Sequence, residues 1–494
     1  MLTQLKQASN HTYTENEALT YKSSGNYCLD FFATAGALRN ADRNSILERY
    51  IRAFAESREY AMKTLFFARD IRGGLGERRL FRIILRYLAH AERELLIRNI
   101  PIIAEYGRYD DLLVLIGTKC EAAAIGFIRS VITADIDKMR RGQPVSLLAK
   151  WLPSVNTSSM KQRSLARIIA KRLHWSHEEY RKNLSALRTH IDVLEKRLCN
   201  KDYSFEYEIQ PSKALFKYRA AFNRNDAERY KQFLTDVSGG HAELKTGSLY
   251  PYDIVRRCSD GQSLDENERL SLDVTWKALE DYTDGRNALV VVDGSGSMYG
   301  DTQVRPIDVA VSLGIYFAQR NSGAFKNHFI TFSESPRLIE IKGRDIAEQV
   351  AYCMSFNEIA NTNLFKTLML ILDTAVSNRL PQDQLPEMLY IISDMEFDSC
   401  ADDADRTVYE YAKELFEEKG YKMPNVIFWN VDSRQEQQPV SMHETGVALV
   451  SGMSPILFKM VVCGDIDPLS FMKNILDSGR YDKVVWNLPD DEAA

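Results

Sequence analysis

A run of five apolar residues, Ala288 to Val292, is followed directly by Asp293 and then by a loop of glycine and serine residues. An uninterrupted apolar run of this length predicts a strand buried on both faces, as in a parallel sheet covered by helices. Asp293 then lies at the carboxyl end of the strand, the edge where open α/β sheets bind their ligands. This stretch therefore predicts both an α/β fold and a site.

The loop after this strand offers oxygen atoms as ligands. Asp293, Ser295 and Ser297 supply one carboxylate and two hydroxyls at alternate positions, and the glycines between them allow a tight turn. Mg²⁺ prefers six such oxygens, with Mn²⁺ and Ca²⁺ as alternatives. A dinucleotide loop would need glycine in place of Tyr299, and neither serine has the flanking glycines of a nucleophile elbow. An aspartyl-phosphate enzyme would normally carry a second carboxylate at position 295. The simplest alternative is a structural turn after a core strand.

Two later segments complete the predicted metal site. A second apolar run, 388–392, also leads to an aspartate, Asp394, and a polar loop carries Thr362. Because parallel strands end at the same edge of a sheet, we expect Asp394 to lie beside the first loop. Thr367 and Asp398 are the alternatives to Thr362 and Asp394.

Strand and helix patterns alternate from residue 286 to residue 494, which predicts a doubly wound, mainly parallel sheet covered on both faces. The expected strands are 288–292, 328–332, 388–392, 425–429 and 447–450, with a hairpin-like segment at 338–341. The expected helices are 307–319, 344–352, 364–377, 405–418, 454–461 and 468–476.

The first part of the chain has a different pattern. Apolar residues recur three and four apart from residue 27 to about residue 202, for example in 46–65 and 80–97, with short loops between the segments. This predicts an all-helical domain, 26–285, of stacked antiparallel pairs of the HEAT-like repeat kind. Residues 1–25 are polar and without periodicity, and are expected to form a loose arm. The acidic segment 259–285 is expected to be a hinge.

Basic residues cluster in the helical half, which carries a net positive charge, whereas residues 286–494 carry a net negative one. Arginine side chains and the backbone amides of a glycine loop both suit phosphate, and Trp151 nearby could stack on a base. The alternative is a set of solvated helix faces, partly neutralised by Asp70 and Glu77. The candidate RNA contacts are Arg69, Arg72, Arg78, Arg79, Arg82, Lys171, Arg172, Lys213 and Lys217.

These motifs resemble known families. The loop at 293–297 with Thr362 and Asp394 resembles the metal-ion-dependent adhesion site of von Willebrand factor A domains. A helical half joined to such a domain resembles the Ro autoantigen architecture, a TROVE domain plus an A domain, whose members bind small structured and misfolded RNAs. A closer resemblance, over roughly residues 20–485, is to a Ro-related family catalogued as a domain of unknown function. Its motifs lie at 68–78, 106–112, 147–153, 250–254, 293–298 and 392–397.

The leading hypothesis is a non-enzymatic, Mg²⁺-dependent binding protein. The helical half would hold RNA, and the A-like domain would bind a carboxylate of a protein partner at the metal. The alternative is a protein-interaction scaffold with no nucleic-acid role. None of the eight histidines lies beside the Asp293 loop in sequence, so no catalytic residue is assigned. The seven scattered cysteines form no Cys-x-x-Cys pair. With no apolar span or leader, we expect a cytoplasmic protein without a membrane partner.

Overall fold

The computed structural model describes residues 9–283, 285, 287–300, 302, 304–356, 363–398, 407–461 and 467–488. Its first half is helical and its second half contains a mixed, mainly parallel sheet. The helices of the first half are α2 (Tyr27–Thr34), α3 (Arg43–Glu56), α4 (Arg58–Arg69), α5 (Arg78–Ala91), α6 (Arg93–Asn99), η1 (Ile100–Ile102), α7 (Ile103–Tyr106), η2 (Tyr109–Leu115), α8 (Glu121–Arg140), α9 (Leu148–Trp151), α10 (Met160–Leu173), α11 (His177–His190), α12 (Leu194–Cys199), α13 (Ser212–Asn225), α14 (Ala227–Ser238), α15 (Pro251–Ser259) and α16 (Glu266–Lys277).

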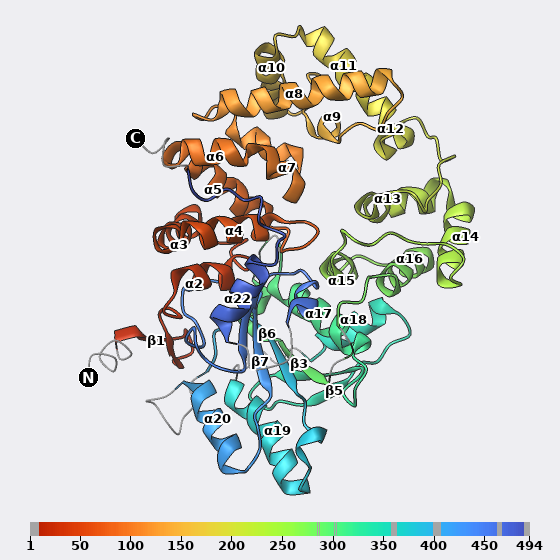
Figure 1. Cartoon of the computed structure of the whole chain (residues 1–494). Coiled ribbons are helices and arrows are strands. Elements are labelled where there is room, and N and C mark those ends of the chain that lie inside the picture. Colours follow the sequence, from red (N-terminus) through yellow and green to blue (C-terminus); the bar gives the residue numbers. More distant parts are fainter. Residues whose placement is uncertain are drawn as a thin grey trace.

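These helices form an arch over the sheet. In Figure 1, α2 lies next to the sheet and α3 to α7 follow at increasing distance from it. Helices α8 to α12 cross at the far end, and α13 to α16 return to the sheet. Side-chain caps set several helix starts, and Ser57 divides the predicted helix 46–65 because it ends α3 and caps α4 by accepting from the Tyr60 amide. Consecutive helices pack on one another, as the amphipathic periodicity predicts.

The sheet of the second half has the strand order β5-β4-β3-β6-β7-β8, with every pair parallel except β4 and β5. The predicted strands and the predicted hairpin-like segment are confirmed within a residue or two. The strands are β3 (Ala288–Asp293), β4 (His328–Phe332), β5 (Leu338–Glu340), β6 (Met388–Ser393), β7 (Asn425–Asn430) and β8 (Val447–Ser451).

Helices cover both faces of this sheet because its strands are apolar on both sides. Leu289 and Val291 of β3 pack in one core with α19 (Leu364–Asn378) and α20 (Val408–Glu418). Val290 and Val292, which point the other way, pack in a second core with α17 (Pro306–Arg320), α21 (Leu457–Met460) and α22 (Pro468–Leu476). The expected helix at 454–461 is shorter in the structure, and α18 (Ile346–Met354) lies beside α17.

The hydrophobic core continues across residue 286. Phe32 of α2 lies 6.2 Å, centroid to centroid, from Phe471 of α22, and Phe67 of α4 lies 6.0 Å from Tyr481. One cluster of buried side chains therefore includes the early helices and one face of the sheet. The two halves are packed together rather than merely joined.

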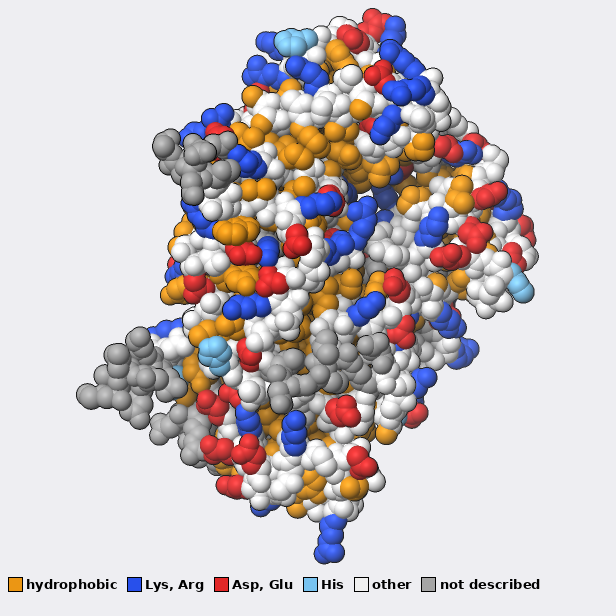
Figure 2. Space-filling model, in the orientation of Figure 1, with side chains coloured by type: hydrophobic (Ala, Val, Ile, Leu, Met, Phe, Trp, Pro, Cys, Tyr) orange, Lys and Arg blue, Asp and Glu red, His pale blue; other side chains and the backbone are white. Residues whose placement is uncertain are grey.

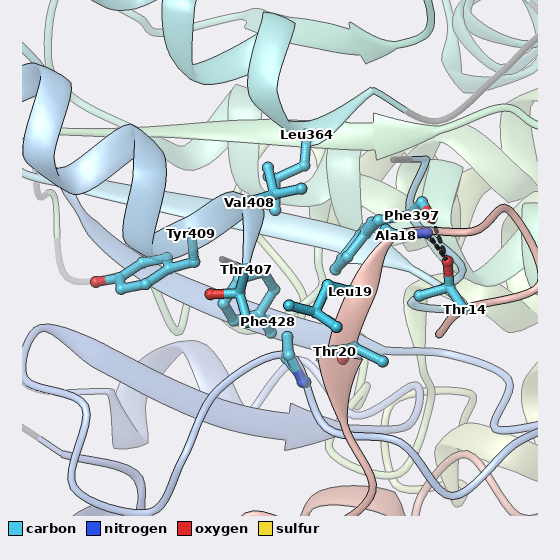
Figure 3. A pocket seen from close by; sticks show the side chains of 11 residues that line it. Thr14, Ala18, Leu19, Thr20, Leu364, Phe397, Thr407, Val408, Tyr409 and Phe428 are labelled. Atoms are coloured by element: carbon cyan, nitrogen blue, oxygen red, sulfur yellow. Dashed lines mark hydrogen bonds between the residues drawn. The ribbon is translucent and has the colours of Figure 1, made fainter. Parts of the chain in front are cut away.

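The N-terminal segment is a docked hairpin rather than a loose arm. Strands β1 (His11–Tyr13) and β2 (Leu19–Tyr21) pair with each other, and Tyr21 bridges to Gln438 beyond β7. The Thr14 hydroxyl donates to the carbonyl of Phe397 at 2.6 Å. Figure 3 shows Leu19 lying among the apolar side chains of a small pocket in the second half. The polar composition of the segment gave no indication that it packs against the second half of the chain.

The expected hinge, 259–285, contains helix α16, which Asp265 caps by accepting from the Glu268 amide. Arg269 on this helix forms ion pairs with Asp345 at 2.7 Å and Glu348 at 3.1 Å. Much of this segment is therefore packed helix rather than open linker. Among the described residues, none of the helices combines the length and apolar character needed to cross a membrane.

Candidate functional site

The carboxyl ends of β3 and β6 bring the predicted metal ligands together. The two strands are parallel neighbours, with Val292 opposite Ile392. Asp293 ends β3, and its two oxygens accept hydrogen bonds from the Ser295 amide at 2.9 Å and the Ser393 hydroxyl at 2.5 Å. The loop then turns so that the Ser295 hydroxyl lies 3.0 Å from the hydroxyl of Ser297. Two hydroxyls and a carboxylate therefore share one side of the loop.

The electrostatics of this edge favour a cation. Asp293 is fully buried, and burial together with the negative charge of Asp394 raises its pKa to about 7. Asp394 is also buried and accepts a hydrogen bond at 2.9 Å from Arg434, a residue of the loop after β7. Two buried carboxylates this close repel each other unless a positive charge lies beside them.

Four of the five predicted metal ligands meet at this edge, namely Asp293, Ser295, Ser297 and Asp394. The fifth, Thr362, lies outside the described residues. Within the described ranges there is no group of three or more His, Cys, Asp or Glu side chains suited to a metal. The donors present are two carboxylates and two hydroxyls, which suit Mg²⁺, an ion that keeps several waters. On this composition the residues fit the ion.

The two alternative ligands have other surroundings. Thr367 is buried in α19, where its hydroxyl donates to the Asn363 carbonyl at 3.1 Å. The backbone of Asp398 forms an isolated antiparallel bridge with that of Glu17 in the N-terminal hairpin, and burial together with the charge of Glu334 raises the pKa of Asp398 to about 6.

The raised pKa of Asp293 predicts a pH dependence of the metal-free protein. The unfolded chain titrates this carboxyl near pH 4, so between about pH 4 and pH 7 the folded state binds more protons. The free energy of unfolding should therefore fall as pH rises through this range. Asp293→Asn should flatten the fall, measured by urea unfolding in chelator at pH 5 and pH 8. Equal slopes for both proteins would contradict this.

The predicted RNA contacts do not form one surface. Arg69 is 2% exposed and donates to Asp111 at 2.7 Å, so the structure places this predicted contact in an ion pair inside the protein. Arg82 is tied to Asp110 at 2.7 Å and to Asp111 at 2.6 Å. These pairs hold η2 against α4 and α5.

The glycine loop after α4 also has a structural partner. Asp70 accepts hydrogen bonds from the amides of Arg72 and Gly73, both at 3.0 Å, so these amides are used inside the protein. A Cβ on Gly73 would lie 2.3 Å from the Arg480 side chain. The absence of a side chain at Gly73 therefore makes room for the C-terminal segment and not for a phosphate.

Other predicted contacts are scattered. Arg72 donates to the Glu105 carbonyl at 3.1 Å, and Arg79 donates to the Ala41 carbonyl at 2.5 Å. Lys171 and Arg172 lie at the end of α10, at the far end of the arch, where Arg172 forms an ion pair of 2.5 Å with Glu121.

The remaining predictions fall on elements that surround the inside of the arch. Arg78 begins α5, and its pKa is lowered by burial and by the nearby charges of Arg82 and Arg108. The Arg108 guanidinium lies 4.0 Å from the ring centroid of Trp151 in α9. Cationic and aromatic side chains therefore share this side.

The last two predicted contacts, Lys213 and Lys217, lie on α13, one of the helices that return to the sheet. The Lys213 ammonium lies 5.2 Å over the ring of Tyr250, whose hydroxyl donates to the Leu75 carbonyl at 3.5 Å, just before α5. Lys217 is exposed and lies 4.8 Å over the ring of Tyr218. Figure 2 shows Lys and Arg side chains gathered beside a hollow near the centre of this face. We call the following set the inner rim: Arg78, Arg108, Trp151, Lys213, Lys217, Tyr218 and Tyr250.

Two residues of these sites escaped the sequence analysis. Arg108 belongs to the motif at 106–112. Its contact with Trp151, which is distant in sequence, can be recognised only once the fold is known. Arg434 had no signal at all, because its contact with Asp394 joins loops 40 residues apart.

Comparisons with known proteins place the chain among relatives of undescribed function. The model of a domain of unknown function, DUF2828, matches residues 14–124 and 128–283, and that of a second, DUF7788, matches residues 287–470. The uncharacterized protein L728 of Acanthamoeba polyphaga mimivirus is 27% identical over 517 residues, covering 97% of this chain and 89% of that protein. The crystal structure of the Deinococcus radiodurans RO (RSR) protein is 15% identical, with a TM-score of 0.43, covering 94% of this chain and 96% of that one.

Proposed function

The chain belongs to the DUF2828 family, whose model matches more than half of it, and we propose that it is a non-enzymatic binding protein for RNA and for a protein partner. RNA is held at the inner rim of the helical arch. The partner supplies a carboxylate to a Mg²⁺ ion at the sheet edge. The observation that carries the RNA assignment is the grouping of cationic and aromatic side chains on elements that face one another.

The charge of the inner rim supports this assignment. Arg78 and Lys217 are exposed, and among the described residues neither forms an ion pair. The lowered pKa of Arg78, caused by partial burial of its side chain and by two neighbouring guanidiniums, indicates positive charge that is only partly balanced by Asp110 and Asp111. An incoming phosphate relieves this repulsion.

The aromatic side chains give the inner rim a second means of binding RNA. Trp151, Tyr218 and Tyr250 each have a cation over one ring face. All three are partly exposed, and bases stack on such rings with little regard to sequence. The combination of backbone-neutralising cations with stacking rings suits unpaired nucleotides, such as the loops and ends of structured or misfolded RNAs.

The sheet edge suits a different partner. Asp293, Ser295, Ser297 and Asp394, with Thr362, would hold the ion, which supplies a positive charge and an open position for an anionic ligand. The net negative charge of residues 286–494 disfavours a polyanion there, whereas a single carboxylate from a protein can approach. The pairing of two buried carboxylates in this edge supports the assignment.

The RNA assignment is tested with charge reversal at the inner rim of the full chain. Arg78→Glu with Lys217→Glu should weaken binding of structured and single-stranded RNA by about tenfold or more. It should also reduce the slope of log K against log salt by about 0.7 for each phosphate that the variant no longer neutralises. Fluorescence anisotropy over a salt series measures both quantities.

The matched control reverses two exposed charges on α10, Arg167→Glu with Lys171→Glu, which lie at the far end of the arch. This variant should bind RNA nearly as the wild type does. Equal weakening by both variants would move the RNA to the outer surface. An absence of RNA binding by the wild-type protein would favour the alternative, a protein scaffold without nucleic acid.

A further inference from the structure

An arginine of the chain itself occupies the predicted metal ligand Asp394. Its Oδ2 accepts from Arg434 at 2.9 Å, and its Oδ1 accepts from the Glu396 amide at 3.3 Å. The other side of the Arg434 guanidinium forms an ion pair of 2.8 Å with Glu15 of the N-terminal hairpin. Both oxygens of the buried carboxylate are therefore engaged, one of them by a full positive charge.

We propose that Arg434 is a built-in competitor for the cation at Asp394, positioned by Glu15, so that metal binding requires Arg434 to release this carboxylate. The proposal rests on the metal site put forward above. Two positive charges on one carboxylate repel each other strongly where water is largely excluded, so the guanidinium and the ion cannot share Asp394 at full strength. The affinity for metal is then set partly by what holds Arg434.

After release from Asp394, the Arg434 guanidinium can stay bound to other carboxylates. Glu15 already binds it, and Glu396 lies near enough to add to the electrostatic attraction that keeps this guanidinium charged. Glu396 in turn accepts from the Glu15 amide at 2.9 Å and from Gln437 at 2.8 Å. The released guanidinium therefore remains among carboxylates, and only its hydrogen bond to Asp394 has to break.

The same network ties the metal site to the N-terminal hairpin. The loop that carries Arg434 also contains Gln438, which exchanges backbone hydrogen bonds of 3.1 Å and 2.8 Å with Tyr21. A movement of Arg434 thus acts on residues that dock the hairpin. Because coupling between two equilibria is reciprocal, a docked hairpin and a bound metal must influence each other.

The test measures metal affinity directly, by calorimetric titration of the full chain with MgCl₂ and MnCl₂. Arg434→Ala and Arg434→Gln should each bind metal more tightly than the wild type, by about tenfold, the usual size of a charge-assisted hydrogen bond to a buried group. The glutamine variant removes the positive charge but keeps more of the side chain than alanine does, so it guards against an effect of lost packing.

The control is Arg52→Ala. Arg52 forms an ion pair of 2.8 Å with Glu436 on the same loop, so its loss removes an equal charge near the site without freeing Asp394. Its metal affinity should change less than threefold. Unchanged or weaker binding by both Arg434 variants, with normal binding by the wild type, would overturn the inference while sparing the metal site. An absence of metal binding by wild-type and Arg434 variants alike would overturn both.

Discussion

Asp70→Ala is expected to lower the free energy of unfolding by roughly 3–5 kcal/mol, the largest effect of any single substitution considered for this protein. Asp70 is fully buried and accepts from the Arg480 guanidinium at 2.9 Å and from the Tyr481 hydroxyl at 3.3 Å. Its removal leaves the two backbone amides that it also holds without their acceptor and takes the carboxylate partner from Arg480, while the Tyr481 hydroxyl keeps the Gly73 carbonyl at 3.2 Å.

Urea unfolding of the full chain measures this change, and Asp70→Asn should fall between the alanine variant and the wild type because it keeps one acceptor. Arg72→Ala is the matched control: its exposed side chain donates to the Glu105 carbonyl, so a loss of about 0.5 kcal/mol or less is expected. An Asp70→Ala protein as stable as this control would show that the C-terminal segment is not held by Asp70.

Asp293→Ala is expected to abolish the stabilisation of the folded protein by Mg²⁺. An ion that binds only the folded state adds RT ln(1 + [L]/Kd), about 2.7 kcal/mol at a hundredfold excess over Kd. Asp293 supplies the central carboxylate of the proposed site. In the Asp293→Ala variant the remaining carboxylate is Asp394, whose charge is neutralised by Arg434. The melting temperature with and without Mg²⁺ gives the increment for each protein.

Asp432→Asn is the control for this experiment. Asp432 is a buried carboxyl of the loop after β7, accepts a hydrogen bond from Asn40 at 3.2 Å, and is not a proposed ligand. This variant should keep the response to Mg²⁺. A full response in Asp293→Ala, or its loss in Asp432→Asn, would place the ion elsewhere.

The sheet could be predicted from the sequence because its strands are buried on both faces. Runs such as 288–292 and 388–392 contain no polar residue that would suit a solvent-facing strand, so their length alone indicated strands at the centre of a covered sheet. Parallel pairing then followed from the alternation with helices, and it placed Asp293 and Asp394 at one edge.

The hairpin at the N-terminus and helix α16 could not be predicted in the same way. The hairpin is polar, and its partners, Phe397 and Gln438, lie hundreds of residues later in the chain. Helix α16 was hidden in an acidic segment whose charges are matched by ion pairs such as that of Arg269 with Asp345. The local composition of a segment does not indicate which residues, distant in sequence, it will contact in the fold.

The same limitation explains the outcome for the basic residues. The sequence marks Arg69 and Arg78 as equal members of one cluster, yet Arg69 is buried against Asp111, 42 residues away, and Arg78 is exposed. Pairing across such distances decides which cations are free to meet a ligand. Three of the predicted metal ligands lie within five residues on one loop, so their closeness to one another does not depend on pairing across such distances.

The attachment of Arg480 and Tyr481 to Asp70 has a consequence for how the protein is made. These contacts join residues 410 and 411 positions apart, so the first helices leave the ribosome long before the segment that completes their core. At about 5–20 residues per second, the interval is roughly 20–80 s. During that time Phe67 and Tyr106 lack the ring of Tyr481 that packs against both. We therefore expect the nascent helical half to expose part of its apolar core until residues 480 and 481 have been synthesised.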